Sequence, residues 1–154
     1  MKHICASILV VALIAAVADA QTVRQVPSDN YPTIQAAITA AQANDTVRVA
    51  PGTYVENINF LGKAITVVSV AGPDVTIIDG NAAGSVATFT TNEGLSSVLE
   101  GFTLRNGKVT SIDGGGIRIS SASPTVRRNQ ILKNSACNGV GIAINNGSPL
   151  IQGN

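Results

Sequence analysis

The chain has 154 residues, with ten Lys or Arg, nine Asp or Glu and one His, and its formal net charge is +1. A surface with so little charge, and with both signs balanced, does not favour nucleic acid or an anionic membrane as a partner. The single histidine is His3 and there is no tryptophan. Beyond the first few residues, the chain therefore lacks an imidazole for catalysis or for zinc.

The first twenty residues predict a secretory signal peptide. Lys2 and His3 precede a largely apolar run from Ile4 to Val17, and Ala18-Asp19-Ala20 fits a small-x-small cleavage site. This run is shorter than the roughly 20 apolar residues of a membrane-spanning helix, which disfavours an anchor. We therefore expect a secreted protein, or one at the cell surface or in the periplasm, whose mature chain, 21–154, contains no membrane span.

Removal of this peptide leaves Cys137 as the one cysteine, so no internal disulfide is possible. A lone thiol in an oxidising compartment is usually buried or paired with another chain. We expect Cys137 to occupy a buried turn or strand position.

The next predicted element is an amphipathic helix over about residues 33–43. Thr33 is a suitable N-cap and Asn44 a suitable left-handed residue after the last turn. One apolar stripe at helical spacing contains Ile34, Ala37, Ile38 and Ala41. A solenoid of strands needs such an element to cover its first coil, which would otherwise expose core and strand edges.

From residue 46 onward the chain alternates between short β-branched runs and turns rich in Gly, Pro and Asn. The strand predicted over 97–105 has a bend at Gly101, and residues 108–113 form a predicted loop. The other predicted strands of this region cover 46–50, 56–60, 64–70, 75–78 and 86–90.

Two segments near the end repeat each other, since Gly, Ile, Ile, Ser-Pro, an aliphatic residue and Asn recur in register between 116–129 and 141–154. A repeat of this length built from strands predicts a right-handed parallel β-helix, in which coils stack at about 4.8 Å and Asn bonds along the stack. Three aliphatic columns are predicted: Val47, Ile77, Leu104 and Leu132; Ile58, Val86, Ile117 and Ile142; Ile65, Val98, Val126 and Ile151. The last repeat is incomplete, and we expect further coils in a longer protein or a partner that covers this one.

Residues 31–38 and 45–57 resemble the N-terminal cap and first coil of the pectin-lyase-like superfamily, and the likeness covers 27–154. It implies the β-helix fold, and lyases, esterases, hydrolases and non-catalytic surface proteins all share that fold. The Arg-x-Trp of pectinesterases and the Gly-His-Gly of polygalacturonases are absent. We therefore expect a non-catalytic scaffold or weak polysaccharide-binding segment. The alternative is the N-terminal part of a polysaccharide-active enzyme whose catalytic coils lie beyond residue 154.

Arg105 and Lys133 are the candidate binding residues. They lie 28 positions apart, each before an Asn, and as stacked cations they could hold an acidic polysaccharide. The alternative is that both are solvated.

Asp79 and Glu100 are the best candidates for a carboxylate pair of the kind that glycoside hydrolysis needs. The favoured alternative is that Asp79 caps a turn and Glu100 is a solvated strand residue. No catalytic residue, metal site or cofactor is predicted.

Overall fold

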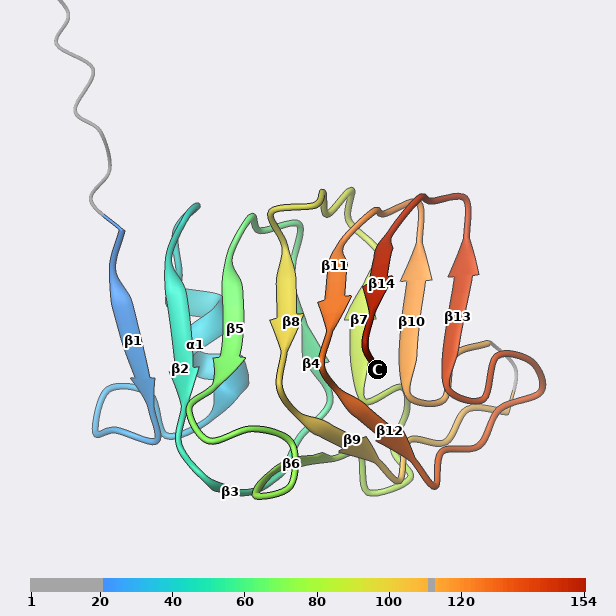
Figure 1. The fold of residues 1–154 in the computed structure, drawn as a ribbon, viewed down its shortest axis with the longest axis horizontal. Coiled ribbons are helices and arrows are strands. Elements are labelled where there is room, and N and C mark those ends of the chain that lie inside the picture. Colours follow the sequence, from blue (N-terminus) through green and yellow to red (C-terminus); the bar gives the residue numbers. More distant parts are fainter. Residues whose placement is uncertain (1–20, 111–112) are drawn as a thin grey trace, which may run out of the picture.

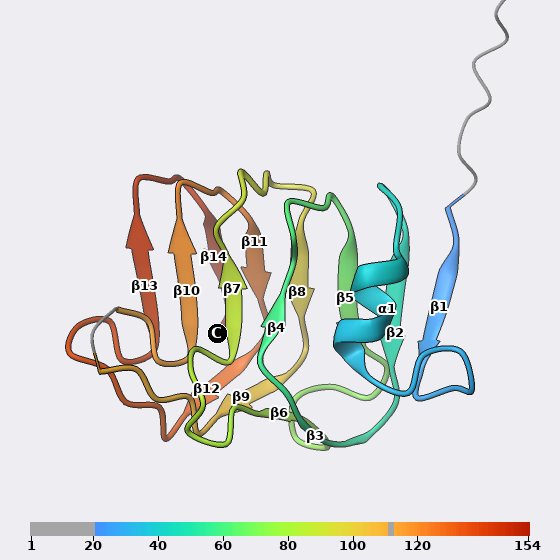
Figure 2. The same ribbon diagram turned by 180° about the vertical axis from the view of Figure 1, so that it is seen from behind.

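The computed structural model describes residues 21–110 and 113–154, so the predicted signal peptide lies outside the described residues. Within this part all paired strands are parallel, and they form three sheets that share one axis and enclose a common interior (Figures 1 and 2). The chain visits the three sheets in turn and then begins the next coil. This confirms the predicted parallel β-helix.

Each sheet is a stack of strands from successive coils. Sheet A contains β1 (Val23–Val26), β2 (Thr46–Val49), β5 (Thr66–Ser69), β8 (Val98–Glu100), β11 (Thr125–Arg127) and β14 (Leu150–Gln152). Sheet B contains β3 (Gly52–Val55), β6 (Thr76–Asp79), β9 (Thr103–Arg105) and β12 (Gln130–Leu132). Sheet C contains β4 (Ile58–Asn59), β7 (Ala87–Phe89), β10 (Ile117–Ser120) and β13 (Ile142–Asn145).

The predicted register is correct for two pairs of the last coils and wrong elsewhere. Leu104 lies beside Ile131 rather than Leu132, and beside Ile78 rather than Ile77. Ile117 lies beside Ile142, and Val126 lies beside Ile151, as the repeat predicts. Val47, however, belongs to sheet A rather than to the column of Leu104. The observed columns are Val47, Val67, Leu99, Val126 and Ile151; Tyr54, Ile78, Leu104 and Ile131; and Ile58, Ala87, Ile117 and Ile142.

Aliphatic and aromatic side chains of the three sheets fill the interior. All three phenylalanines are fully buried, as their strand positions predict, and the rings of Phe60 and Phe89 pack with centroids 4.3 Å apart and planes tilted by 33°. Burial of such large apolar side chains is the main favourable contribution to folding. The tight interior leaves polar groups to the corners and outer faces, where any binding site has to lie.

The helix α1 (Ile34–Ala40) closes one end of the interior, where it lies against β1, β2 and β4 (Figure 2). The Thr33 hydroxyl accepts a hydrogen bond from the Ala36 N–H, which confirms the predicted N-cap, and Ile34 and Ile38 are buried. The helix is shorter than predicted. Asn44 is left-handed, with φ of 69°, but lies beyond the C-cap.

The same end of the solenoid has a strand that the sequence pattern did not indicate. β1 adds to the edge of sheet A beside β2, so strand and helix together form the N-terminal cap (Figure 1). Arg24 of β1 points inward, where its guanidinium donates to the Ala40 carbonyl oxygen and forms an ion pair of 2.9 Å with Asp45. This contact fastens β1 to the end of the helix.

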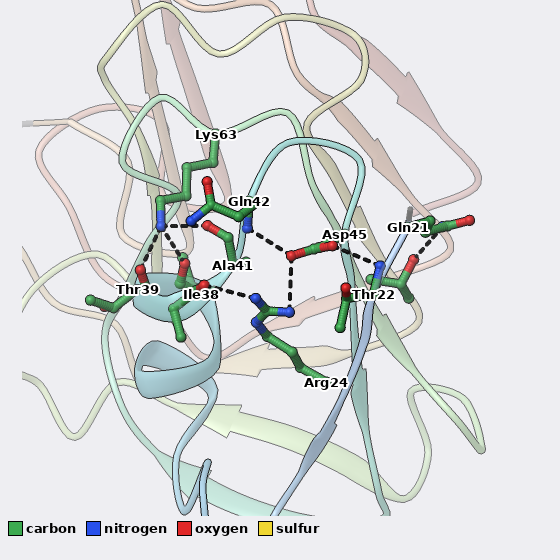
Figure 3. A network of polar contacts seen from close by, with 11 residues as sticks. Gln21, Thr22, Arg24, Ile38, Thr39, Ala41, Gln42, Asp45 and Lys63 are labelled. Atoms are coloured by element: carbon green, nitrogen blue, oxygen red, sulfur yellow. Dashed lines mark hydrogen bonds and ion pairs between the residues drawn. The ribbon is translucent and has the colours of Figure 1, made fainter. Parts of the chain in front are cut away.

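Asp45 and Lys63 join these cap elements through one polar network (Figure 3). The Lys63 ammonium donates to the three carbonyl oxygens at the end of α1, those of Ile38, Thr39 and Ala41. The Asp45 carboxylate accepts hydrogen bonds from the backbone N–H groups of Gln42 and Thr22. The Gln42 N–H lowers the pKa of Asp45, and although burial opposes this, the Thr22 N–H and the Arg24 charge add to the lowering.

Replacing Asp45 with asparagine is expected to destabilise the protein by about 1–2 kcal/mol at neutral pH, because hydrogen bonds to a buried charge are lost. A carboxyl whose pKa is lowered by folding stabilises the native state above its unfolded pKa. That contribution disappears as the pH falls through the folded value. The variant should therefore lose less stability than the wild type between about pH 6 and about pH 3, measured by urea unfolding. Asp29→Asn, at an exposed position, is the control. An identical acid response of Asp45→Asn and wild type would contradict the assignment.

Candidate functional site: a lysine-lined groove

A groove of about 440 Å³ lies on the outside of the solenoid, at the corner where the strands of sheet B end. The turns after β6, β9 and β12 form most of it, and these belong to three successive coils. Its lining consists of Val55, Asp79, Asn81, Ala82, Asn106, Gly107, Lys108, Lys133 and Ser135. It is therefore built by stacked turns rather than by one loop.

Backbone hydrogen bonds set the register of these turns. The Ser135 N–H donates to the Gly107 carbonyl, and Lys108 lies beside Ser135 as an isolated bridge. Leu132 pairs with Arg105, so the next residue, Lys133, stacks on Asn106, and both are left-handed, with φ of 53° and 57°. The predicted alignment of Arg105 with Lys133 is thus wrong by one position, which matters because neighbouring residues of a strand point in opposite directions.

Asp79 is at the centre of a polar cluster on the groove floor. Its Oδ2 atom accepts from Arg105 Nε at 2.8 Å and from Asn106 Nδ2 at 2.9 Å, and its Oδ1 atom accepts from the Asn81 N–H at 3.0 Å. Burial opposes ionisation, but these hydrogen bonds and the Arg105 charge more than offset it and lower the pKa of Asp79. Asp79 therefore caps the turn, as the favoured alternative predicted, and is held as a carboxylate.

Glu100 lies on sheet A and Asp79 on sheet B, so the two do not form one carboxylate pair. Glu100 accepts from Arg127 at 2.7 Å and from Arg128 at 2.8 Å. Its side chain is 14% exposed, so it is not the solvated strand residue that the alternative described. Each carboxylate is thus engaged by arginine.

Lys108 and Lys133 are the exposed cations of the groove. Neither ammonium group has a hydrogen-bond or ion-pair partner among residues 21–110 and 113–154. Since Arg105 balances Asp79, the groove has a net charge of two positive units. The sequence indicated Lys133 but not Lys108, which it placed in a loop. The stacking of residues 106–108 on residues 133–135 of the next coil is the feature that would have indicated Lys108.

Cys137 is exposed, contrary to the buried position predicted for it. It lies outside the interior, in a loop between β12 and β13, and its thiol donates to the Thr110 carbonyl oxygen at 3.2 Å. This loop stacks on the one between β9 and β10, where Asn138 donates to Asp113. Cys137 is exposed because it lies in a long connection between two sheets. Local sequence patterns do not distinguish such a connection from a tight corner of the solenoid.

In the described part of the chain, no group of three His, Cys, Asp or Glu residues is arranged to hold a metal ion. Within the same residues, no helix is both long and apolar enough to cross a membrane.

These features define a parallel β-solenoid protein with a cationic groove at one corner. Residues 59–154 match the family described as "Protein of unknown function (DUF1565)", and the chain belongs to this family. Comparison with curated proteins and with solved structures found no significant match.

Proposed function

We propose that this chain is a secreted or surface β-solenoid, similar to non-catalytic members of the pectin-lyase-like superfamily, that binds acidic polysaccharide weakly through the groove. The observation that carries this proposal is the presence of two ammonium groups, on Lys108 and Lys133, without partners in the described residues. A carboxylate of a sugar chain would supply the missing counter-charge, and Asn81 and Ser135 offer polar groups for sugar hydroxyls.

Two further features support binding rather than cleavage, and weak rather than tight affinity. Asp79 and Glu100 lie on different sheets and are each ion-paired, so they do not offer the acid and base of a glycosidase. Among the residues that the structure describes, no aromatic side chain lines the groove, so a sugar ring would lack a stacking surface there. Binding would therefore depend on charge and on hydrogen bonds, both in competition with water and salt.

The test compares wild type with Lys108→Gln/Lys133→Gln by affinity electrophoresis in gels containing polygalacturonate or a neutral galactan. Wild type should be retarded by polygalacturonate alone, and the double variant should bind about tenfold more weakly, because both charges facing the ligand are removed. Added salt should weaken wild-type binding. Arg128→Gln is the control, since this exposed arginine lies beside sheet A and carries the same charge. Equal retardation of wild type and double variant, or retardation by the neutral polymer, would contradict the proposal.

A further inference from the structure

Arg105, the other residue predicted to bind, does not line the groove. It lies on β9 with its side chain 36% exposed, and its Nε atom donates to the carboxylate of Asp79, which lines the groove. Any contribution of Arg105 to the groove therefore passes first through Asp79.

We propose that Arg105 determines the selectivity of the groove for anions without touching the ligand, by neutralising the charge of Asp79. This inference rests on the proposed function, because it concerns the same groove and the same acidic polysaccharide. Arg105 is on this view a positioning and charge-balancing residue, and Lys108 and Lys133 are the residues that contact the ligand.

The charge of Asp79 matters because this residue lies within the groove itself. Any ligand carboxylate held there would be within a Debye length, about 8 Å at physiological salt, so the two like charges would repel each other. With Arg105 in place, Asp79 is balanced and the ligand meets two lysines. Without Arg105, the groove loses half of its net positive charge.

A neutral residue without an acceptor oxygen at position 79 would avoid this repulsion but would weaken the turns. Asp79 also accepts from the Asn106 side chain, one coil further on, and from the Asn81 N–H in its own turn. The carboxylate thus joins the turns after β6 and β9, which form the groove floor. The coils need an acceptor at this position, and Arg105 makes its charge compatible with an anionic ligand.

The experiment compares four proteins for retardation by polygalacturonate: wild type, Arg105→Gln, Asp79→Asn/Arg105→Gln and Arg105→Lys. Arg105→Gln should weaken binding about threefold to tenfold by exposing the Asp79 charge. The double variant restores the balance and should bind within about twofold of wild type. Arg105→Lys keeps the charge and should also bind within about twofold of wild type. An arginine that held the ligand carboxylate by bidentate contact could not be replaced by lysine in this way.

The matched control is Arg127→Gln, which breaks an ion pair of the same kind, Arg127 with Glu100 at 2.7 Å, on sheet A. It should leave retardation unchanged, and circular dichroism should show that each variant is folded. If the double variant remains as weak as Arg105→Gln, or if Arg105→Gln binds like wild type, the inference is overturned while the proposed function stands. If wild type is not retarded, or if removing both lysines has no effect, the proposed function fails and the inference fails with it.

Discussion

Replacing Gly107 with alanine is expected to destabilise the protein by about 3 kcal/mol or more, because the turn has no space for a methyl group. A Cβ atom at this position would lie 1.9 Å from the Gly115 carbonyl oxygen and 2.8 Å from Val86 Cγ2. The backbone is also fixed from the other side. The Gly107 N–H donates to Asn134 Oδ1 at 2.7 Å, and its carbonyl accepts from the Ser135 N–H.

The measurement is thermal unfolding followed by far-ultraviolet circular dichroism, and a loss of this size should lower Tm by about 10 °C. Gly94→Ala is a matched control, because among the described residues no atom beyond Gly94 and its two chain neighbours lies within 4 Å of its Cβ position, and its backbone is not in the left-handed region. It should change stability by less than about 0.5 kcal/mol. Similar effects of the two substitutions would show that Gly107 is not packed closely against Gly115 and Val86.

Asn129→Ala should have the second large effect, a loss of about 3 kcal/mol, because it removes a hydrogen bond from each of two buried backbone groups. Asn129 is 2% exposed. Its Oδ1 atom accepts from the Phe102 N–H at 3.0 Å, and its Nδ2 atom donates to the Leu99 carbonyl oxygen at 3.1 Å. Both partners belong to the preceding coil, so the side chain bonds one coil to the next.

Asn154→Ala is the matched control for this substitution. Asn154 makes the same two bonds one coil later, to the Asn129 N–H and to the Val126 carbonyl oxygen, but it is exposed, so water can replace the lost bonds. We expect a loss of less than about 1 kcal/mol, measured by urea unfolding on both variants. An equal loss in the two variants would mean that burial does not determine the strength of this asparagine ladder.

The ladder and the register between residues 116–129 and 141–154 were predictable because the sequence repeats itself there. The Ile117–Ile142 and Val126–Ile151 pairs follow from two segments that match residue for residue, and the recurring Asn marks the corner after sheet A. The class of fold follows from the same repeat. The N-cap residue Thr33 could also be predicted from the sequence, because an N-cap is a local feature.

The early register could not be obtained in this way. Alternation with a period of two indicates which residues of a strand share a face, but not to which of three sheets the strand belongs. Val47 was therefore assigned to the wrong sheet. The apolar runs place Val86 and Val98 one position before the true core partners, Ala87 and Leu99, and place Leu132 one position after Ile131, since such a run is compatible with both choices.

The candidate site was predictable only in part, because it depends on contacts between coils. Lys133 was identified from its position before an Asn, but a difference of one residue separates Arg105 from the groove lining. Lys108 gave no signal of its own. The cap network of Arg24, Asp45 and Lys63 was missed for the same reason, because its members lie in separate segments with no motif in common.

The stacking of coils also determines how far a disturbance can travel. Each strand pairs with strands about 25 residues away in sequence, and its main contacts are with the coils just before and just after its own. Such a molecule behaves energetically as a one-dimensional chain of units coupled to their nearest neighbours. Lys108 and Lys133 lie on successive coils. A ligand held by both would stabilise the interface between these two coils. Their amide hydrogens would then exchange with solvent as a single cooperative unit.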